Sequence, residues 1–222
     1  MDQAVRYNRF LLDQILRWAA GKHVILDFGA GNGRFAIAVQ QAGIGVHAIE
    51  ADPGLREIIS AGDVVAHAGF AALANREFDG IYTLNVLEHI EDDDAVLSKF
   101  HEHLRAGGGL LVYVPAFALL FSSNDVRVGH VRRYRRRPLV AQLERAGFIV
   151  DQARYVDSIG FAAGLVYRFL GDREGGLDLR AVRFYDAVLF PISRVLDRVL
   201  DRFLGKNLLI LAHKPAAAEH AA

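Results

Sequence analysis

The sequence contains no cysteine, and methionine and tryptophan occur once each in its 222 residues. Without a thiol, disulfide bonds, a cysteine nucleophile and thiolate-bound metals are all excluded. Basic and acidic residues number 26 each, so the net charge gives no overall reason to expect nucleic acid as a partner. There is no run of about 18 uncharged apolar residues, so no transmembrane helix is predicted. The charged N-terminus is unlike a signal peptide, and a cytoplasmic location is expected.

Short apolar segments alternate with helical patterns along most of the chain. The segments predicted to be strands are 24–28, 46–50, 64–68, 78–85, 109–115, 148–156 and 207–214. The predicted helices are 5–20, 33–42, 54–61, 93–105 and 138–146. This alternation predicts an α/β fold with a parallel sheet covered on both faces. Ligands of such sheets bind beyond the carboxyl ends of the strands.

A glycine-rich turn follows the first predicted strand in VILDFGAGNG, with glycines at Gly29, Gly31 and Gly33. Glycine allows a positive φ and lets a ligand approach the N–H groups at a helix N-terminus. A dinucleotide-binding G-x-G-x-x-G motif would need glycine at position 34, which is Arg34. The pattern is instead Asp27 followed by G-x-G-x-G, and the second strand ends in Glu50, an acid suited to ribose hydroxyls. The spacing argues against a dinucleotide, but a glycine turn with a nearby acid also occurs by chance, so this pair alone leaves the ligand open.

Together with the segments IEADP, FDGIYTLNVLEHIEDD, LRAGGGLLVYVPA and LERAGF, this turn makes the chain resemble the class I S-adenosylmethionine (SAM)-dependent methyltransferases. The resemblance covers nearly the whole chain. It is closest to a bacterial small-molecule or lipid-type branch with PA-F, S-x-x-D and GH-x-RRY after the fifth strand and GKNLL…KP at the end. It implies a Rossmann-like, seven-stranded, mostly parallel sheet with an antiparallel last strand, helices on both faces, and a helical insertion between strands 6 and 7.

The resemblance also implies SAM as the methyl donor. The residues it assigns to the cofactor are Asp27, Gly29, Ala30, Gly31, Asn32, Gly33, Glu50, Ala51, Phe70 and Asn85. The turn would face the methionine end of SAM, and Asp27 would orient the turn or reach the ligand's amino group through water. Glu50 would bind the ribose, with Ala51 beside the adenine. The backbone carbonyl of Asn85 would lie near the ligand's ammonium group.

One departure from the family concerns the adenine. Related sequences often have Asp after the third strand, whereas this chain has Ala68 near that position. Adenine recognition is therefore expected to rely on backbone groups and on packing by Phe70.

The acceptor side is expected in the loop after the fifth strand. The candidate catalytic residues are His130, Tyr134, Arg133 and His89. Methyl transfer is an in-line displacement that needs no covalent protein nucleophile, although a general base helps a hydroxyl acceptor. His130 is the best base candidate because its ordinary pKa lies near neutrality. The alternative for His130 is a role in holding the loop, and a structural role is favoured for His89.

An arginine run lies in the same loop, at Arg132, Arg133, Arg135, Arg136 and Arg137. It could bind phosphate or carboxylate, or its charges could pair with the acids of HIEDDD at 89–94. An anionic small molecule or a lipid-linked headgroup is favoured over nucleic acid. The acids Glu91–Asp94 are attributed to the positive end of a helix dipole, and no metal site is expected.

A single domain is predicted over residues 1–215, with a disordered tail at 216–222. The insertion, at about 158–206, contains an apolar helical stripe formed by Leu189, Ile192, Leu196, Val199 and Phe203. Three surfaces could bury this stripe: the core over the acceptor site, a second copy of the chain in a homodimer, or a membrane in peripheral contact. The cover over the acceptor is favoured. Pro191 is expected to open or kink its helix.

The predicted function is therefore a SAM-dependent methyltransferase that modifies a small-molecule or lipid-linked acceptor. Oxygen is the favoured acceptor atom, and an anionic acceptor is expected. The alternative is a non-catalytic protein of the same fold that binds a partner or a membrane through its insertion. The intact glycine turn and Glu50 favour the enzyme.

Overall fold

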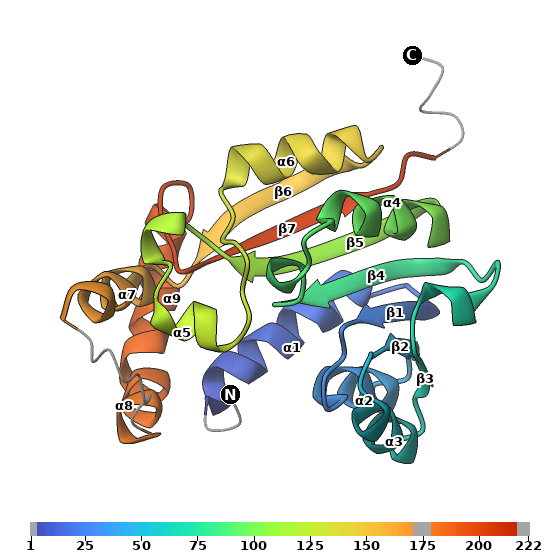
Figure 1. The fold of residues 1–222 in the computed structure, drawn as a ribbon, viewed down its shortest axis with the longest axis horizontal. Helices are drawn as coiled ribbons and strands as arrows, with labels where there is room; N and C mark the ends of the chain where they lie inside the picture. Colours follow the sequence, from blue (N-terminus) through green and yellow to red (C-terminus); the bar gives the residue numbers. More distant parts are fainter. Residues whose placement is uncertain (1–3, 171–178, 217–222) are drawn as a thin grey trace.

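The computed structural model of the protein describes residues 4–170 and 179–216, which form a seven-stranded sheet flanked by helices (Figure 1). The strands are β1 (Val24–Phe28), β2 (Gly45–Ile49), β3 (Val65–His67), β4 (Phe78–Leu84), β5 (Leu104–Pro115), β6 (Ile149–Val156) and β7 (Asn207–His213). Their order is β3-β2-β1-β4-β5-β7-β6. Only β7 runs antiparallel to its neighbours, β5 and β6, within this described sheet. The predicted fold is confirmed.

The helices form two layers around the sheet (Figure 1). They are α1 (Val5–Ala19), α2 (Arg34–Gln41), α3 (Pro53–Ala61), α4 (Asp93–His103), α5 (Ser123–Arg127) and α6 (Arg136–Arg145). The first three cover one face, and α4 and α6 cover the other. The short helix α5 is absent from the sequence-based expectations. It begins with a capping box in which Ser122 and Asp125 satisfy each other's backbone N–H groups.

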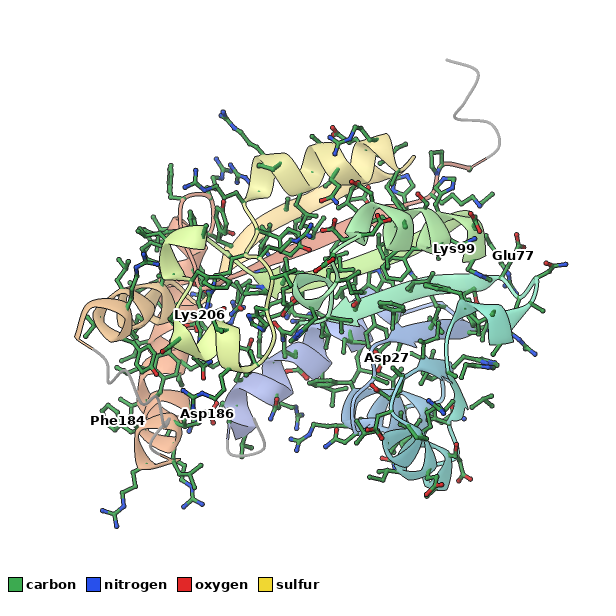
Figure 2. All side chains as sticks on the ribbon, in the orientation of Figure 1. Asp27, Glu77, Lys99, Phe184, Asp186 and Lys206 are labelled. Carbon is green, nitrogen blue, oxygen red and sulfur yellow. The ribbon has the colours of Figure 1, made fainter. Side chains whose placement is uncertain are left out.

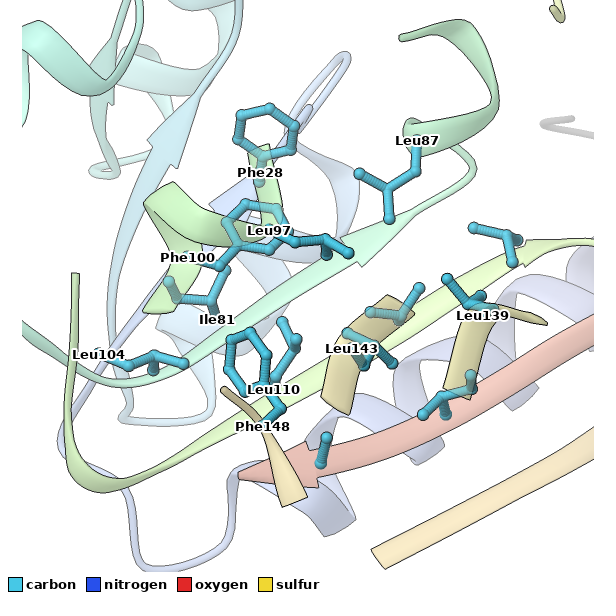
Figure 3. Close-up of a cluster of buried hydrophobic side chains, with 14 of the residues drawn as sticks. Phe28, Ile81, Leu87, Leu97, Phe100, Leu104, Leu110, Leu139, Leu143 and Phe148 are labelled. Atoms are coloured by element: carbon cyan, nitrogen blue, oxygen red, sulfur yellow. The ribbon is translucent and has the colours of Figure 1, made fainter. Parts of the chain in front are cut away.

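The core consists of two clusters, one on each face of the sheet. Strand β5 supplies both, since Leu110 and Val112 point into one cluster while Leu111 and Tyr113 point into the other. Figure 3 shows the first cluster, where α4 and α6 bring Phe100 and other apolar side chains over the sheet. Burial on both faces explains why the central strands read as continuous apolar runs.

Between β6 and β7 the chain forms the predicted helical insertion, which gathers at one end of the sheet (Figure 1). It comprises α7 (Ser158–Leu170), α8 (Leu179–Phe184), a π-helical turn (Tyr185–Leu189) and α9 (Phe190–Leu200). Pro191 lies in the first turn of α9, where its missing N–H is tolerated, and the wider π turn directly precedes it.

Buried carboxylates fix how the insertion sits on the body. Asp197 of α9 accepts hydrogen bonds from the backbone N–H groups of Asp157 (3.0 Å) and Ser158 (2.9 Å), at the start of α7. Asp186 of the π turn accepts from the N–H groups of Arg6 and Tyr7 (both 2.8 Å), at the start of α1. These acids satisfy helix N-termini that have no intrahelical partners. The insertion is therefore held in one rotational setting by directional polar contacts.

This setting overturns the expected burial of the apolar stripe. Phe190, Ser193 and Asp197 are the buried residues of α9, so they form its inner face. Most of the stripe points outward instead: Ile192, Leu196, Val199 (73%) and Phe203 (70%) are exposed, and Leu189 is half-buried. Figure 2 shows Phe184 on the outer side of the insertion and Asp186 toward α1. The stripe is therefore not a cover packed on the core of its own chain.

No helix in residues 4–170 or 179–216 has both the length and the apolar character needed to span a bilayer. Of the predicted tail, 216–222, all but Ala216 lies outside the described residues.

Candidate active site

The glycine turn joins β1 to α2 at the carboxyl end of the sheet. Gly29, Gly31 and Gly33 all have positive φ, at 77°, 57° and 74°. A Cβ on Gly29 would lie 2.3 Å from a methyl carbon of Val86, so the turn packs directly against the loop after β4. A Cβ on Gly31 would meet no atom within 4 Å, so there is open space beside the middle of the turn. Glycine is thus required by packing at one position and leaves room for a ligand at another.

Hydrogen bonds attach this turn to the end of β2. The N–H groups of Gly29 and Ala30 both donate to the Ile49 carbonyl, at 2.9 and 3.1 Å. The half-buried carboxylate of Glu50 accepts from the N–H of Gly31 (2.8 Å) and from that of Asp52 (3.0 Å). A carboxylate accepts about four hydrogen bonds, so Glu50 keeps capacity for two hydroxyls of a ligand. Glu50 therefore holds the turn while facing the place where a ribose is expected.

The remaining cofactor candidates surround the turn. Asp27 is buried and accepts a hydrogen bond from the Tyr82 hydroxyl (2.7 Å). Burial raises the pKa of Asp27 to about 7, although the Tyr82 hydrogen bond opposes the shift. Asn85 follows β4 with a φ of 54°, a left-handed conformation that redirects its backbone at the sheet edge. Asn32 is exposed, and its side chain accepts from the N–H of Arg34 near the start of α2. Ala51 is exposed beside Glu50.

Phe70 is engaged with the core. Its ring stacks on Phe28 at 5.3 Å and on His103 at 5.5 Å between centroids, both nearly parallel. Phe70 is nevertheless half-buried, so its contact with adenine, together with backbone groups near Ala51, stays a prediction.

On the acceptor side, the loop after β5 is organised by Asp125. This buried carboxylate accepts two hydrogen bonds from Arg133, one from Nε (2.8 Å) and one from Nη2 (3.0 Å). It accepts a third from His130 Nδ1 (2.7 Å). Burial alone would raise the pKa of Asp125, but the hydrogen bonds from Arg133 and His130 outweigh it and hold the pKa below its ordinary value. The guanidinium group of Arg133 is therefore paired within the loop and is not placed to bind an acceptor.

Tyr134 and Arg132 are similarly committed, to Asp93 at the start of α4. The Tyr134 hydroxyl, which has one proton to donate, lies within hydrogen-bond distance of Asp93 (2.7 Å) and of the Leu87 carbonyl (3.0 Å). Arg132 donates to Asp93 (3.0 Å) and to the Glu91 carbonyl (2.7 Å). The arginine run thus pairs in part with the acidic segment at 89–94, as the second of the two interpretations expected. Tyr134 is placed to fix the loop and not to touch an acceptor.

Glu88, His89 and His130 come together where the loops after β4 and β5 meet. Glu88 is 0% exposed, and neither of its carboxylate oxygens has a hydrogen-bond partner among residues 4–170 and 179–216. His130 Nε2 lies 3.8 Å from Glu88 Oε1, and the rings of His89 and His130 meet edge to face at 4.7 Å. His89 Nδ1 is 3.2 Å from the Gly129 carbonyl, to which it can donate. Burial lowers the pKa of His130 and raises that of Glu88 to about 8.

The sequence analysis missed Glu88 and Asp125 as residues of this site. Both lie inside motifs it used, Glu88 beside His89 in LEHI and Asp125 in the S-x-x-D pattern. The signal in the sequence was an acid near each candidate histidine. Glu88 directly precedes His89, and Asp125 lies five positions before His130.

A match to a protein-family model shows the family to which this chain belongs. The family model described as "Methyltransferase domain" matches residues 3–153, well over half of the chain. The chain belongs to the methyltransferase-domain family. The predicted class I SAM-dependent methyltransferase is thereby confirmed, and the enzyme interpretation prevails over the non-catalytic one.

Solved structures share the fold of this methyltransferase at low sequence identity. A SAM-dependent methyltransferase from Archaeoglobus fulgidus is 17% identical with a TM-score of 0.62, and the match covers 93% of this chain and 94% of that one. Phosphoethanolamine N-methyltransferase 2 from Haemonchus contortus, solved with SAM, is 18% identical with a TM-score of 0.60 and coverages of 92% and 52%. The [4+2]-cyclase SpnF is 20% identical with a TM-score of 0.63 and coverages of 93% and 80%. No curated protein matches the sequence.

The residues of the methyltransferase fit SAM. Open space beside Gly31, the unused acceptor capacity of Glu50 and the left-handed turn at Asn85 lie on neighbouring strand ends. Hydroxyl donors of a ribose suit a carboxylate, and a ligand's ammonium group suits backbone carbonyls.

Replacing Glu50 tests this assignment. Glu50→Ala is expected to weaken SAM binding by about 1.5–3 kcal/mol, or roughly 10- to 150-fold, because charge-assisted hydrogen bonds to the ribose are lost. The loss of the Gly31 contact adds to the same effect. Calorimetric titration with SAM measures the change. Glu57→Ala, which removes an exposed acid of α3, is the control and should leave the affinity nearly unchanged. Equal affinity in Glu50→Ala and the wild type would remove Glu50 from the cofactor site.

Proposed function

We propose that this methyltransferase transfers the methyl group of SAM to an oxygen atom of a small-molecule or lipid-linked acceptor. The observation that carries the proposal is His130, whose Nδ1 is held by Asp125 at 2.7 Å, so that Nε2 is left to face Glu88. A histidine oriented by a carboxylate through one nitrogen can accept a proton at the other. The name of the phosphoethanolamine N-methyltransferase among the structural neighbours also supports a small-molecule acceptor.

When bound, SAM supplies a methyl group on a positively charged sulfur, which leaves as a neutral thioether. His130 Nε2 takes the proton from the acceptor hydroxyl as the new O–C bond forms. Asp125 then stabilises the imidazolium through the Nδ1–H group, with its own negative charge maintained by Arg133. Because burial lowers the pKa of His130, the ring is neutral and ready to accept a proton at neutral pH. A carboxylate acceptor would not need this base.

The arginine run supports the acceptor's predicted negative charge only in part. Arg132 and Arg133 are paired with Asp93 and Asp125, so their charges are largely satisfied within the protein, whereas Arg135 and Arg137 are exposed. Positive charge is also displayed on the insertion, at the exposed Arg198 of α9 and at Arg202 after it.

His130→Ala is expected to lower kcat by about 100-fold or more with a hydroxyl acceptor, since a positioned general base contributes about that much. The affinity for SAM should change little, because the glycine turn and Glu50 do not contact His130. Turnover with a hydroxyl-bearing acceptor and titration with SAM measure the two effects separately. His23→Ala, at an exposed position before β1, is the control. An unchanged kcat in His130→Ala would leave His130 only a role in holding its loop.

We propose further that the outer face of the insertion docks on an anionic membrane surface from which a lipid-linked acceptor is drawn. The outer face comprises the exposed residues Phe184, Val188, Ile192, Val195, Leu196, Val199 and Phe203. Their spacing of three and four places them along one side of the helical segment. Burying each large side chain stabilises by about 1.5–3 kcal/mol, so an uncovered row of this length favours a partner surface.

Charge distinguishes a membrane from a second copy of the chain. In the described part of the insertion, 158–170 and 179–206, the acids are Asp186, Asp197 and Asp201, of which the first two are buried and the third is half-buried. Arg198 and Arg202 are exposed, so the charge displayed beside the outer face is positive. A two-fold dimer through this face would bring like charges together, whereas anionic headgroups attract each arginine by about 1 kcal/mol.

Vesicle binding tests the docking surface. The wild type is expected to co-sediment with vesicles of phosphatidylcholine and phosphatidylglycerol and much less with phosphatidylcholine alone. The double variant Val199→Glu, Phe203→Glu should lose this binding because it places carboxylates at the apolar contact. Ile58→Glu, which adds a charge at a 52% exposed site on α3, is the matched control and should bind as the wild type does. A wild-type dimer that the double variant abolishes, without vesicle binding, would contradict the membrane proposal.

A further inference from the structure

Glu88 poses a problem that the proposed function does not resolve. Its carboxyl group is completely buried, yet neither oxygen has a hydrogen-bond partner within the described protein. Buried polar groups are nearly always paired, because leaving one unpaired costs about 1–3 kcal/mol and more for a charged group. The nearest basic group with a measured contact is His130 Nε2, at 3.8 Å, which is too far for a hydrogen bond. Within the described residues, therefore, no protein group hydrogen-bonds to the buried carboxyl of Glu88.

The two histidines beside Glu88 are oriented by other groups. His130 Nδ1 is held by the Asp125 carboxylate at 2.7 Å, and His89 Nδ1 lies 3.2 Å from the Gly129 carbonyl. Each contact places a proton on Nδ1 and leaves Nε2 with a lone pair. A carboxylate or backbone carbonyl behind each imidazole is the usual support for a metal-binding histidine, since it fixes both the tautomer and the ring orientation.

The three side chains converge at distances that a single cation can bridge. One ligand atom from each of Glu88, His89 and His130 lies within 4.8 Å of the other two. Donor atoms bound to a first-row metal at about 2.0–2.2 Å stand about 3–4 Å apart, which agrees with the 3.8 Å between Glu88 Oε1 and His130 Nε2. A small rotation of the exposed His89 side chain would bring its ligand nitrogen closer to the ligand atoms of Glu88 and His130.

We propose that Glu88, His89 and His130 form a binding site for one divalent transition-metal cation, such as Zn²⁺, Mn²⁺ or Co²⁺. Two imidazoles and one carboxylate suit these ions, and three protein ligands leave coordination positions open toward the acceptor side. The cation gives Glu88 the partner that it lacks in the protein. The acids Glu91–Asp94, which the sequence analysis weighed as metal ligands, take no part in this site, because Asp92 caps α4 and Asp93 binds Arg132 and Tyr134.

The proposal goes beyond methyl transfer to oxygen and can fail independently of it. His130 cannot hold a metal and accept a proton at Nε2 at the same time, so in the metal-loaded protein the open coordination positions would receive the acceptor oxygen. If no metal binds, His130 remains available as a base. If the acceptor atom proves to be nitrogen, the metal site is unaffected.

Metal binding is measured directly on tag-free, chelator-treated protein without any acceptor. Titration with Zn²⁺ by calorimetry should give one site per chain, and Co²⁺ should give visible d–d absorption from a site with nitrogen ligands. Because the chain has no cysteine, thiol binding cannot account for either signal. Glu88→Gln, which keeps the side-chain shape, and His130→Ala should each weaken the affinity by about 100-fold or more. Asp125→Asn, which removes the carboxylate behind His130 together with its ion pair to Arg133, should weaken it by about 10- to 100-fold.

A second histidine pair supplies the matched control. His47 and His67 stack, with Nδ1 and Nε2 2.9 Å apart, on the neighbouring strands β2 and β3. His47→Ala should leave the stoichiometric site intact. SAM binding by each variant reports correct folding, because none of the residues assigned to SAM is one of the three proposed ligands. Absence of a stoichiometric site in the wild type would overturn the proposal, as would binding that survives Glu88→Gln and disappears in His47→Ala.

Discussion

The hydrogen bonds between the glycine turn and the end of β2 are the contacts on which the cofactor side depends. Ile49 receives the N–H groups of Gly29 and Ala30, and Glu50 receives that of Gly31. These bonds hold an otherwise permissive backbone in one shape and aim the carboxylate at the same space. They are possible because β1 and β2 are parallel neighbours whose carboxyl ends meet at one edge of the sheet. The proposed cofactor site therefore requires β1 and β2 to be parallel neighbours as well as the glycines of the turn.

Buried carboxylates organise the rest of the molecule in the same way. Asp125 and Asp93 fix the loop after β5 through arginine, tyrosine and histidine donors, while Asp186 and Asp197 fix the insertion through backbone N–H groups. The donors to Asp93, Asp186 and Asp197 come from distant parts of the sequence, whereas those to Asp125 come from its own loop. Glu88 differs, since it is as deeply buried but has no donor. This contrast is the reason for proposing that Glu88 binds a group from outside the protein.

The strands, most helices and the glycine turn could be predicted from the sequence, because apolar period and glycine spacing are local signals. The orientation of α9 could not, since Asp197 binds the backbone of residues 157 and 158, about 40 positions away. The apolar stripe predicts the wrong buried face for this helix. The hydrogen bonds of the buried Asp197 to the start of α7 determine which face turns inward. The sequence left two interpretations of the arginine run open, because the partners of Arg132 and Arg133 lie on α4 and α5 and are brought close only by the fold. The burial of Glu88 has no local signature.

Calorimetric titration of the wild-type protein with SAM, with its demethylated product and with NAD tests most directly whether the turn and Glu50 form the cofactor site of a methyltransferase. SAM and its product are expected to bind once per chain with a Kd in the micromolar range or tighter, and NAD to give no binding heat. Glu50 and the space beside Gly31 would accommodate a ribose in either ligand, but the second glycine-to-glycine spacing excludes the dinucleotide motif. Binding of NAD without binding of SAM would contradict the assignment.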